Sequence, residues 1–239
     1  GRILKAFGGN DSGGEVYGNI SILVSQAGYT ESTCPIDMDY LYGGGNNADS
    51  KTASMDIRYA NNIGYVFGGA CAANMSGSID LNIVAGKIGT VFGGNDQSGT
   101  ISGDHINVTV KWLDEEYEGV DYKYENNSLG SVYGGGNVAD YAGSTQVKVL
   151  NATLTGNVYG GGKKADIGKS TKVIIGDWNP AHAVVIGGDV YGGGDKAAVK
   201  ESTDVTINDC GTLIQGDVYG GGNAGVVEGN TDVKIGECN

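Results

Sequence analysis

The chain has 239 residues, of which 45 are glycine and only two are proline, and its formal net charge is −13. Abundant glycine without proline or a strict three-residue period excludes collagen, and the ordered alternation of β-branched residues excludes a disordered chain. The negative charge disfavours nucleic acid and anionic lipid as partners, and no apolar run of about 18 residues could span a membrane.

An aromatic residue followed by a glycine run recurs along the whole chain, at intervals of 25 to 41 residues. The eight aromatic residues, in chain order, are Phe7, Tyr42, Phe67, Phe92, Tyr133, Tyr159, Tyr191 and Tyr219. An apolar residue precedes each of them and a polar residue usually precedes that one, which predicts a β-strand ending at each glycine run. A fixed minimum spacing near 25 with occasional additions indicates a solenoid.

A second strand is predicted after each glycine run. Early repeats keep an apolar pair there, as in Leu81 and Ile83, whereas late repeats follow the pattern T-x-V-x-I or T-x-V-x-V at 145–149, 171–175, 203–207 and 231–235. A short third stretch, such as Leu154–Gly156, leads back to the next aromatic residue. We therefore expect an all-β, right-handed parallel β-helix of about eight coils, forming one domain over residues 1–239.

Stacked coils place equivalent residues in columns with the strand spacing of about 4.8 Å. The aromatic residues are expected to stack beside glycine corners, which permit positive φ and close approach of neighbouring coils. Strand parity tilts the rings outward, although the glycine corner could turn them inward. The residues after the glycine runs are expected to form a polar ladder, as asparagines do in cross-β stacks: Asn10, Asn46, Asn95, Asn137, Lys163, Asp195 and Asn223.

The longest additions to the repeat are about Ser25–Asp37, Lys111–Ser128 and Gly176–Ala183. Solenoid insertions map to one edge, which is often the binding face. Their aromatic and histidine residues define a candidate recognition edge for sugar rings or protein side chains: Trp112, Tyr117, Tyr122, Tyr124, Trp178 and His182. The alternative is that these rings fold back over the flank of the solenoid as a satellite core.

The four cysteines suggest at most one structural pair. Cys210 and Cys238 are one repeat apart, which places them on adjacent coils within disulfide range, either bonded or as two reduced thiols. Cys34 and Cys71 are not equivalent in register and are expected to be small buried fillers. A disulfide would favour an exported protein.

No catalytic residue, metal site or cofactor is assigned. The acidic run 114–121 could offer oxygen ligands to Ca²⁺, but it matches no known loop and is typical of a solvated segment. His105 and His182 are the only histidines, and no Ser/His/Asp triad can be assembled from the sequence. An ice-binding face would need a row of outward-facing threonines. Thr145 and Thr171 lie two residues before inward-facing valines, so they are expected to point inward as well, which disfavours ice binding.

The stack of V-Y-G-G-G-N corners with T-x-V-x-I strands resembles right-handed parallel β-helix proteins of the pectate-lyase-like class. It is more closely similar to the repetitive stalk and adhesin regions of bacterial cell-surface proteins. The resemblance implies an extracellular or cell-surface module that binds a glycan or a host or cell-surface protein, or acts as a spacer.

Enzymes of the same class imply the alternative role, a lyase or glycoside hydrolase acting on polysaccharide. The lyases use an aspartate cluster with Ca²⁺ and an arginine or lysine base. Arg2 and Arg58, the two arginines of the chain, do not lie in acidic clusters, which favours the non-catalytic role. The chain begins at Gly1 without a methionine or a recognisable leader, which indicates a processed or trimmed form.

Overall fold

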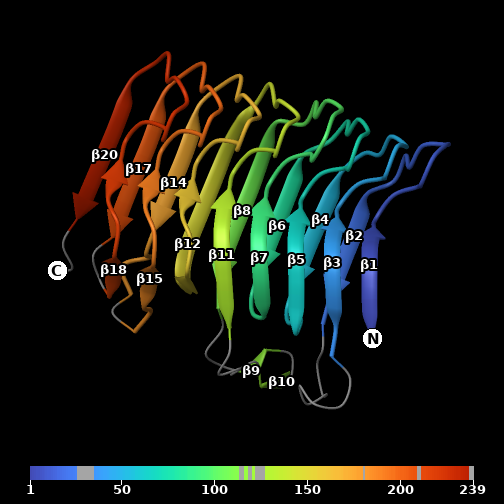
Figure 1. Ribbon diagram of the computed structural model, residues 1–239, viewed down its shortest axis with the longest axis horizontal. Helices are drawn as coiled ribbons and strands as arrows, with labels where there is room; N and C mark the ends of the chain where they lie inside the picture. Colours follow the sequence, from blue (N-terminus) through green and yellow to red (C-terminus); the bar gives the residue numbers. More distant parts are fainter. Residues whose placement is uncertain are drawn as a thin grey trace.

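The computed structural model describes residues 1–25, 35–112, 116–117, 120–121, 127–179, 181–208 and 211–236. Within these ranges every regular element is a β-strand, and the chain winds into a parallel β-helix with its two ends at opposite ends of the stack (Figure 1). The predicted all-β solenoid of eight coils is therefore confirmed. Among the described residues, no helix is long and apolar enough to cross a membrane.

The first parallel sheet carries the strands that end at the glycine runs. Its early members are single strands: β1 (Arg2–Phe7), β3 (Asp37–Tyr42), β5 (Asn62–Phe67), β7 (Lys87–Phe92) and β11 (Ser128–Tyr133). In the last three coils the strand is interrupted, so that β12 (Ser144–Leu154), β15 (Val184–Ile186) and β18 (Thr212–Ile214) are followed by β13 (Val158–Tyr159), β16 (Val190–Tyr191) and β19 (Val218–Tyr219).

The second parallel sheet is formed by the strands that follow the glycine runs. Besides the first part of β12, its members are β2 (Ile20–Val24), β4 (Ala53–Ile57), β6 (Ile79–Ile83), β8 (His105–Lys111), β14 (Thr171–Ile175), β17 (Thr203–Asn208) and β20 (Thr231–Gly236). The late strands pair without a register shift, Thr171 with Thr203 and Thr203 with Thr231, as the sequence alignment of repeats predicts.

The main core lies between the two sheets. Val132, Val158 and Val190 of the first sheet are fully buried and face Val173 and Val205 of the second. Alternate residues of a strand point to opposite faces, so one face of each sheet supplies this core. Because each coil covers the apolar residues of the one before it, the two end coils are the most exposed, as Ile235 in β20 shows at 69%.

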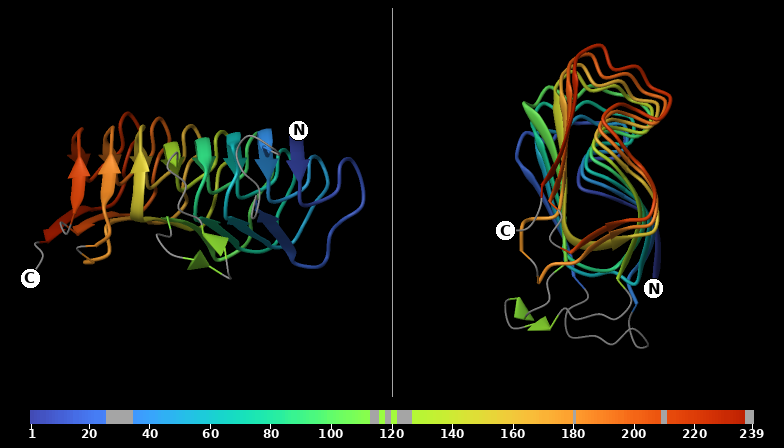
Figure 2. Two further views of the ribbon diagram at one scale, coloured as in Figure 1. Left: turned by 90° about the horizontal axis from the view of Figure 1, so that it is seen from below. Right: turned by 90° about the vertical axis from the view of Figure 1, so that its left-hand side faces the viewer.

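Seen along the axis, each coil has a larger and a smaller lobe joined at a waist (Figure 2). The smaller lobe holds its own core, built on a column of single-residue parallel bridges that includes Met75, Ile101, Tyr141 and Ile167. Thr145 is buried at the start of its strand, and its hydroxyl donates to the carbonyl oxygen of Gly160 at 2.6 Å. Thr171 and Thr203 make the equivalent hydrogen bond in the following coils, so this row of threonines links the second sheet to the glycine corner of the next coil.

The glycine corners exist because neighbouring coils approach closely there. A Cβ added to Gly43 would lie 2.0 Å from the Gly68 carbonyl oxygen, and one added to Gly192 would lie 2.2 Å from that of Gly220. The expectation that these corners use positive φ is wrong, because the described glycines with positive φ, such as Gly86, lie outside the corner runs. The glycine run recurs after each aromatic residue because the backbones of neighbouring coils pack directly against each other there.

Described parts of two insertions lie at the same edge of the solenoid. The antiparallel strands β9 (Glu116–Tyr117) and β10 (Val120–Asp121) form a hairpin within the 111–128 insertion, at the lower edge in Figure 1. The connection from β14 to β15, which contains the 176–183 insertion, descends to that edge as well.

Candidate functional site

The aromatic residues beside the glycine corners form one continuous stack along the solenoid. Successive rings from Phe7 to Tyr219 have centroids 4.6 to 4.9 Å apart and interplanar angles of 10° or less. The rings belong to a cluster separate from the main core, on the opposite face of the first sheet. They nevertheless are buried in most coils, Tyr42 and Phe92 to 1% exposure, because they face the waist between the two lobes.

A column of mostly polar residues lies across the waist from this aromatic ladder. Backbone hydrogen bonds align its members, which are Asp11, Asn46, Cys71, Asp96, Asn137, Lys163, Asp195 and Asn223. Three amides of this polar column donate to the carboxylate of the coil before: Asn46 to Asp11 at 2.8 Å, Asn137 to Asp96 at 2.9 Å and Asn223 to Asp195 at 2.9 Å. The column is therefore held by asparagine–aspartate pairs.

The predicted polar ladder is wrong at two of its seven positions. Asn10 and Asn95 follow only two glycines, and each takes the place that a third glycine has in most other coils. Asn95 is buried, where its side chain accepts from the Ala70 amide at 2.8 Å and donates to the Ala73 carbonyl at 3.1 Å. The next residue, Asp96, then occupies the column, so a pattern that counts from the glycine run shifts by one residue there.

A groove of about 410 Å³ lies between the aromatic ladder and the polar column, and residues of the first six coils line it. Its lining residues come from the ladder, from the polar column and its neighbour, and from the outer surface of the first sheet: Tyr42, Phe67, Phe92, Asp96, Gln97, Asn137, Lys163, Lys5, Tyr40 and Tyr65. Small-ligand sites combine aromatic surface with placed polar groups, and this groove offers both, with the polar groups more prominent than in most such sites.

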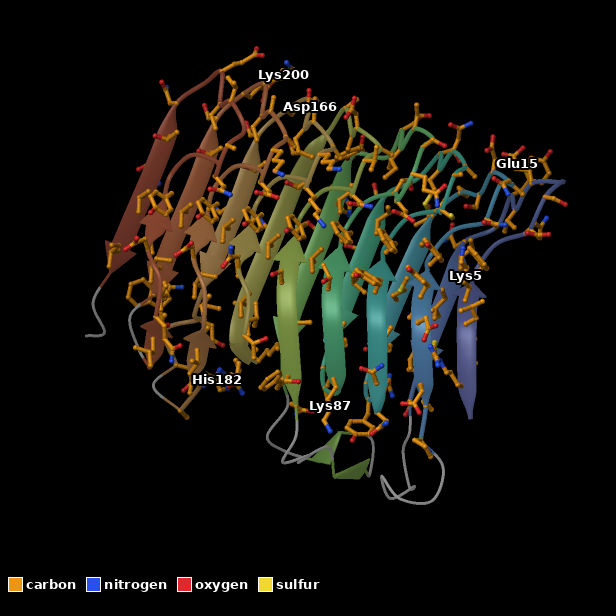
Figure 3. All side chains as sticks on the ribbon, in the orientation of Figure 1. Lys5, Glu15, Lys87, Asp166, His182 and Lys200 are labelled. Atoms are coloured by element: carbon orange, nitrogen blue, oxygen red, sulfur yellow. The ribbon has the colours of Figure 1, made fainter. Side chains whose placement is uncertain are left out.

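Two tyrosines on the outer face of the first sheet form one wall of the groove. Tyr40 in β3 and Tyr65 in β5 are register partners, and their rings stack at 5.2 Å with an interplanar angle of 13°. The ammonium of Lys5 lies 5.6 Å from the centroid of the Tyr40 ring, on the β1 side (Figure 3). Tyr65 is 42% exposed, although a large aromatic side chain is costly to leave in water.

The sequence reasoning missed Tyr40 and Tyr65. Their position, two residues before the ladder ring, is polar in the other coils, and the alternation was used only to identify strands. The two departures from that polar pattern were the available signal, because an aromatic residue at a solvent-facing position of a repeat needs an explanation.

The opposite wall is fixed by the carboxylate of Asp96, which is only 7% exposed. One oxygen accepts from the Tyr42 hydroxyl at 3.0 Å, and the other accepts from the Asn137 amide at 2.9 Å. Burial, assisted by the negative charge of Asp96, raises the pKa of Tyr42 far above its usual value, so the phenol stays a neutral donor. These bonds connect the floor of the groove to its polar wall.

The predicted recognition edge has a different character in the residues that the structure describes. Trp112 is half-buried against the main core, and its backbone exchanges hydrogen bonds with Asn151. Trp178 is 50% exposed, yet its ring lies so close to Gly236 that a Cβ there would be 2.2 Å from it. Both tryptophans thus pack on the solenoid flank. Tyr122 and Tyr124, and the side chain of Tyr117, lie outside the described residues.

His182 belongs to a small polar cluster at this edge, away from Lys5 and the groove (Figure 3). Its Nδ1 is 2.7 Å from Asp177 Oδ2, and Lys111 Nζ is 3.6 Å from the same oxygen, so the bases of two insertions are bridged. Burial opposes ionisation of Asp177, but the bonds from His182 and the Asn179 amide, with the charge of Lys111, lower its pKa. The other ring nitrogen of His182 faces Asn179 Nδ2 at 3.3 Å.

The cysteine pair Cys210 and Cys238 lies outside the described residues, as does Cys34. Cys71 is a buried free thiol within the aromatic ladder cluster. Among the described residues, no group of three or more His, Cys, Asp or Glu side chains is arranged to hold a metal ion.

Comparison with family models, curated proteins and solved structures finds no match to this chain. The functional argument therefore depends on the fold and on the groove.

Proposed function

We propose that this protein is a non-catalytic binding module of the adhesion type, exported and displayed at a cell surface. The observation that carries the proposal is the Tyr40–Tyr65 stack, with a half-buried Tyr40 and an exposed Tyr65, at the rim of a groove whose other wall is polar. Exported location rests on the resemblance of the repeated corners to bacterial surface stalks and adhesins, and protease treatment of intact source cells would test it.

The groove supports binding better than the insertion edge does. Its walls are built on strands held in register from both sides, so the positions of Tyr40 and Tyr65 are fixed before a ligand arrives. Binding to a preorganised surface loses less conformational entropy than binding to loops. At the insertion edge, by contrast, Trp112 and Trp178 already use their rings to cover the solenoid.

A glycan is the ligand class that this chemistry favours. The faces of aromatic rings attract the C–H groups of sugar rings through the ring quadrupole. The facing wall offers donors and acceptors that suit sugar hydroxyls, namely Asp96, Gln97, Asn137 and Lys163. The net charge of −13 disfavours acidic polysaccharides, so an uncharged glycan is favoured over the polyuronates that enzymes of this fold class cleave.

The experiment is a glycan-array and extracellular-protein binding screen with the purified chain and two variants. Tyr65→Ala should abolish binding, whereas Trp178→Ala should leave it unchanged, with both variants checked for an unchanged melting temperature. Loss of binding only in Trp178→Ala would move the site to the insertion edge. Release of new chain ends from any polysaccharide would overturn the non-catalytic role and favour the lyase or glycoside hydrolase alternative.

A further inference from the structure

The column that contains Tyr40 and Tyr65 is an aromatic stack that stops at the third of the eight coils. In register, this outer column runs Lys5, Tyr40, Tyr65, Thr90 and Ser131. A cation and two rings occupy the first three coils, and short hydroxyl side chains occupy the next two. Among the residues that the structure describes, no further ring follows Tyr65 in this column, so the stack ends there.

The outer face of the Tyr65 ring is open. Because the Tyr40 and Tyr65 rings are nearly parallel and stacked along the axis, the second face of Tyr65 points toward the coil of Thr90. The next position lies about 4.8 Å further on, and a threonine is too short to cover a phenol ring. The 42% exposure of Tyr65 agrees with an uncovered face.

The floor beneath this open face carries almost no side chain. Gly89 and Gly130 precede Thr90 and Ser131, and a Cβ on either glycine would strike the neighbouring backbone, at 2.4 Å for Gly89. The floor is thus backbone with two hydroxyls. Beyond Ser131 the slot closes at Asn157, whose side chain is already bonded to the Asp189 amide and the Tyr159 hydroxyl.

We infer that this slot, bounded by Tyr65, Thr90 and Ser131, is a subsite for one uncharged pyranose ring, which continues the aromatic stack. The inference rests on the proposed function and names its ligand class. A sugar ring stacked on Tyr65 stands edge-on to the sheet, so the edge facing the Gly89 and Gly130 backbone cannot carry a further sugar. The subsite therefore takes the terminal or branch residue of a glycan, with the rest of the chain leaving toward solvent.

The chemistry of the slot separates a sugar from the side chain of a protein partner. The hydroxyls of Thr90 and Ser131 and the nearby polar wall suit a ring that carries hydroxyl groups around its rim. The Ser131 hydroxyl already accepts from the Asn157 amide at 3.1 Å but can still donate, so an apolar aromatic side chain would leave this donor and the Thr90 hydroxyl without partners, which costs binding free energy. Within the outer column, the first carboxylate beyond the slot is Asp189, two coils after Ser131. The slot positions of this column therefore carry no charged side chain, which suits an uncharged sugar.

The test compares two variants that add the same ring in different coils of one column. Thr90→Tyr extends the protein's own stack into the slot and should weaken binding of a neutral glycan about tenfold or more, the factor that corresponds to loss of one stacking contact. Asp217→Tyr adds a ring to the same column in the last coil, away from the groove, and leaves the slot open, so its affinity should stay within about twofold of the parent. Circular dichroism and melting temperature verify that both fold.

The remaining arms separate failure of the inference from failure of the proposed function. Methyl glycosides of the terminal sugar should compete with the whole glycan, and a requirement for internal residues would overturn the subsite. Full binding by Thr90→Tyr, with loss in Tyr65→Ala, would remove the slot but keep the groove as the site. If no glycan binds the parent chain, the proposed function itself fails, and Thr90-sensitive binding of a protein alone would overturn the sugar class.

Discussion

The N-terminal and C-terminal halves of the outer column use the same position for opposite purposes. In coils two and three, Tyr40 and Tyr65 place rings at the surface beside the groove. In coils seven and eight, Asp189 and Asp217 occupy that position and accept hydrogen bonds from the hydroxyls of Tyr191 and Tyr219, with oxygen–oxygen distances of 2.9 and 3.1 Å. The first arrangement leaves aromatic surface in contact with solvent, whereas in the second the carboxylates are hydrogen-bonded within the protein.

Side-chain oxygens in the C-terminal half also hold the backbone of the following coil. Asp189 Oδ1 accepts from the Asp217 amide at 2.8 Å, and Asn157 Oδ1 accepts from the Asp189 amide at 2.9 Å. The difference between the halves teaches that the inward positions of this repeat are fixed by stacking, while an outward position can serve either stability or recognition. The predictions below test that division.

The largest effect is expected at the glycine corners, equally in both halves. Gly43→Ala and Gly192→Ala should each destabilise the fold by about 3 kcal/mol or more, because the new methyl group would strike backbone that cannot relax by rotation. Gly13→Ala is the control, since nothing lies within 4 Å of its added Cβ. Chemical denaturation measures the change, and a corner variant as stable as Gly13→Ala would refute backbone contact as the reason for glycine.

The next effect distinguishes the hydroxyl of Tyr42 from that of Tyr219. Tyr42→Phe should cost about 1–3 kcal/mol, because buried Asp96 loses one of its two hydrogen-bond donors. Tyr219→Phe should be nearly neutral, because that hydroxyl and its partner Asp217 are exposed. Free energies of unfolding measured side by side decide the matter, and equal losses would contradict a special role for the groove wall.

Alkaline pH should weaken the C-terminal ladder, where every ring is a tyrosine. Burial, with the hydrogen bond to Asp189, raises the pKa of Tyr191, and burial also raises the pKa of Tyr133 and that of Tyr159 in the same ladder. The unfolded chain loses these protons near pH 10, so it binds fewer protons than the folded chain above that pH, and stability falls as pH rises. The loss reaches at most about 1.4 kcal/mol per pH unit for each phenol.

Tyr191→Phe removes one such phenol and should flatten the fall of melting temperature between pH 9.5 and about 11. Phe92→Leu is a useful comparison, since it shortens the ring stack without changing the number of titrating groups. An unchanged pH slope in Tyr191→Phe would mean that this phenol titrates in the folded state as it does in the unfolded chain.

The smallest effect concerns the cation at the start of the outer column. Lys5→Met keeps most of the apolar stem but removes the ammonium that lies over Tyr40, and it should cost about 0.5 kcal/mol. Raising the salt concentration should shrink the difference between the two proteins, because the interaction is electrostatic and exposed. A difference that grows with salt would indicate that stem packing, not charge, is lost.

The sequence alone determined the fold. The repeat interval, the Val and aromatic residues before each glycine run and the T-x-V-x-I strands define one coil, and in-register stacking is the only way for such short strands to bury their apolar faces. The repeat therefore places Tyr159, Tyr191 and Tyr219 in one column, and the observed strand register agrees. Local pattern carries this information because each coil contacts only its neighbours.

Three features depend on the tertiary structure and could not be predicted from the repeat: the burial of the ladder, the position of Asn95 and the groove. The rings of the ladder are buried outside the main core because the coil has a waist, and the lobes that make the waist arise from the whole coil path. The displacement of Asn95 by one place depends on how its side chain bonds to the coil before. The groove joins Tyr65 to Asp96 across that waist, and a contact between two different faces of a solenoid leaves no periodic trace in the sequence.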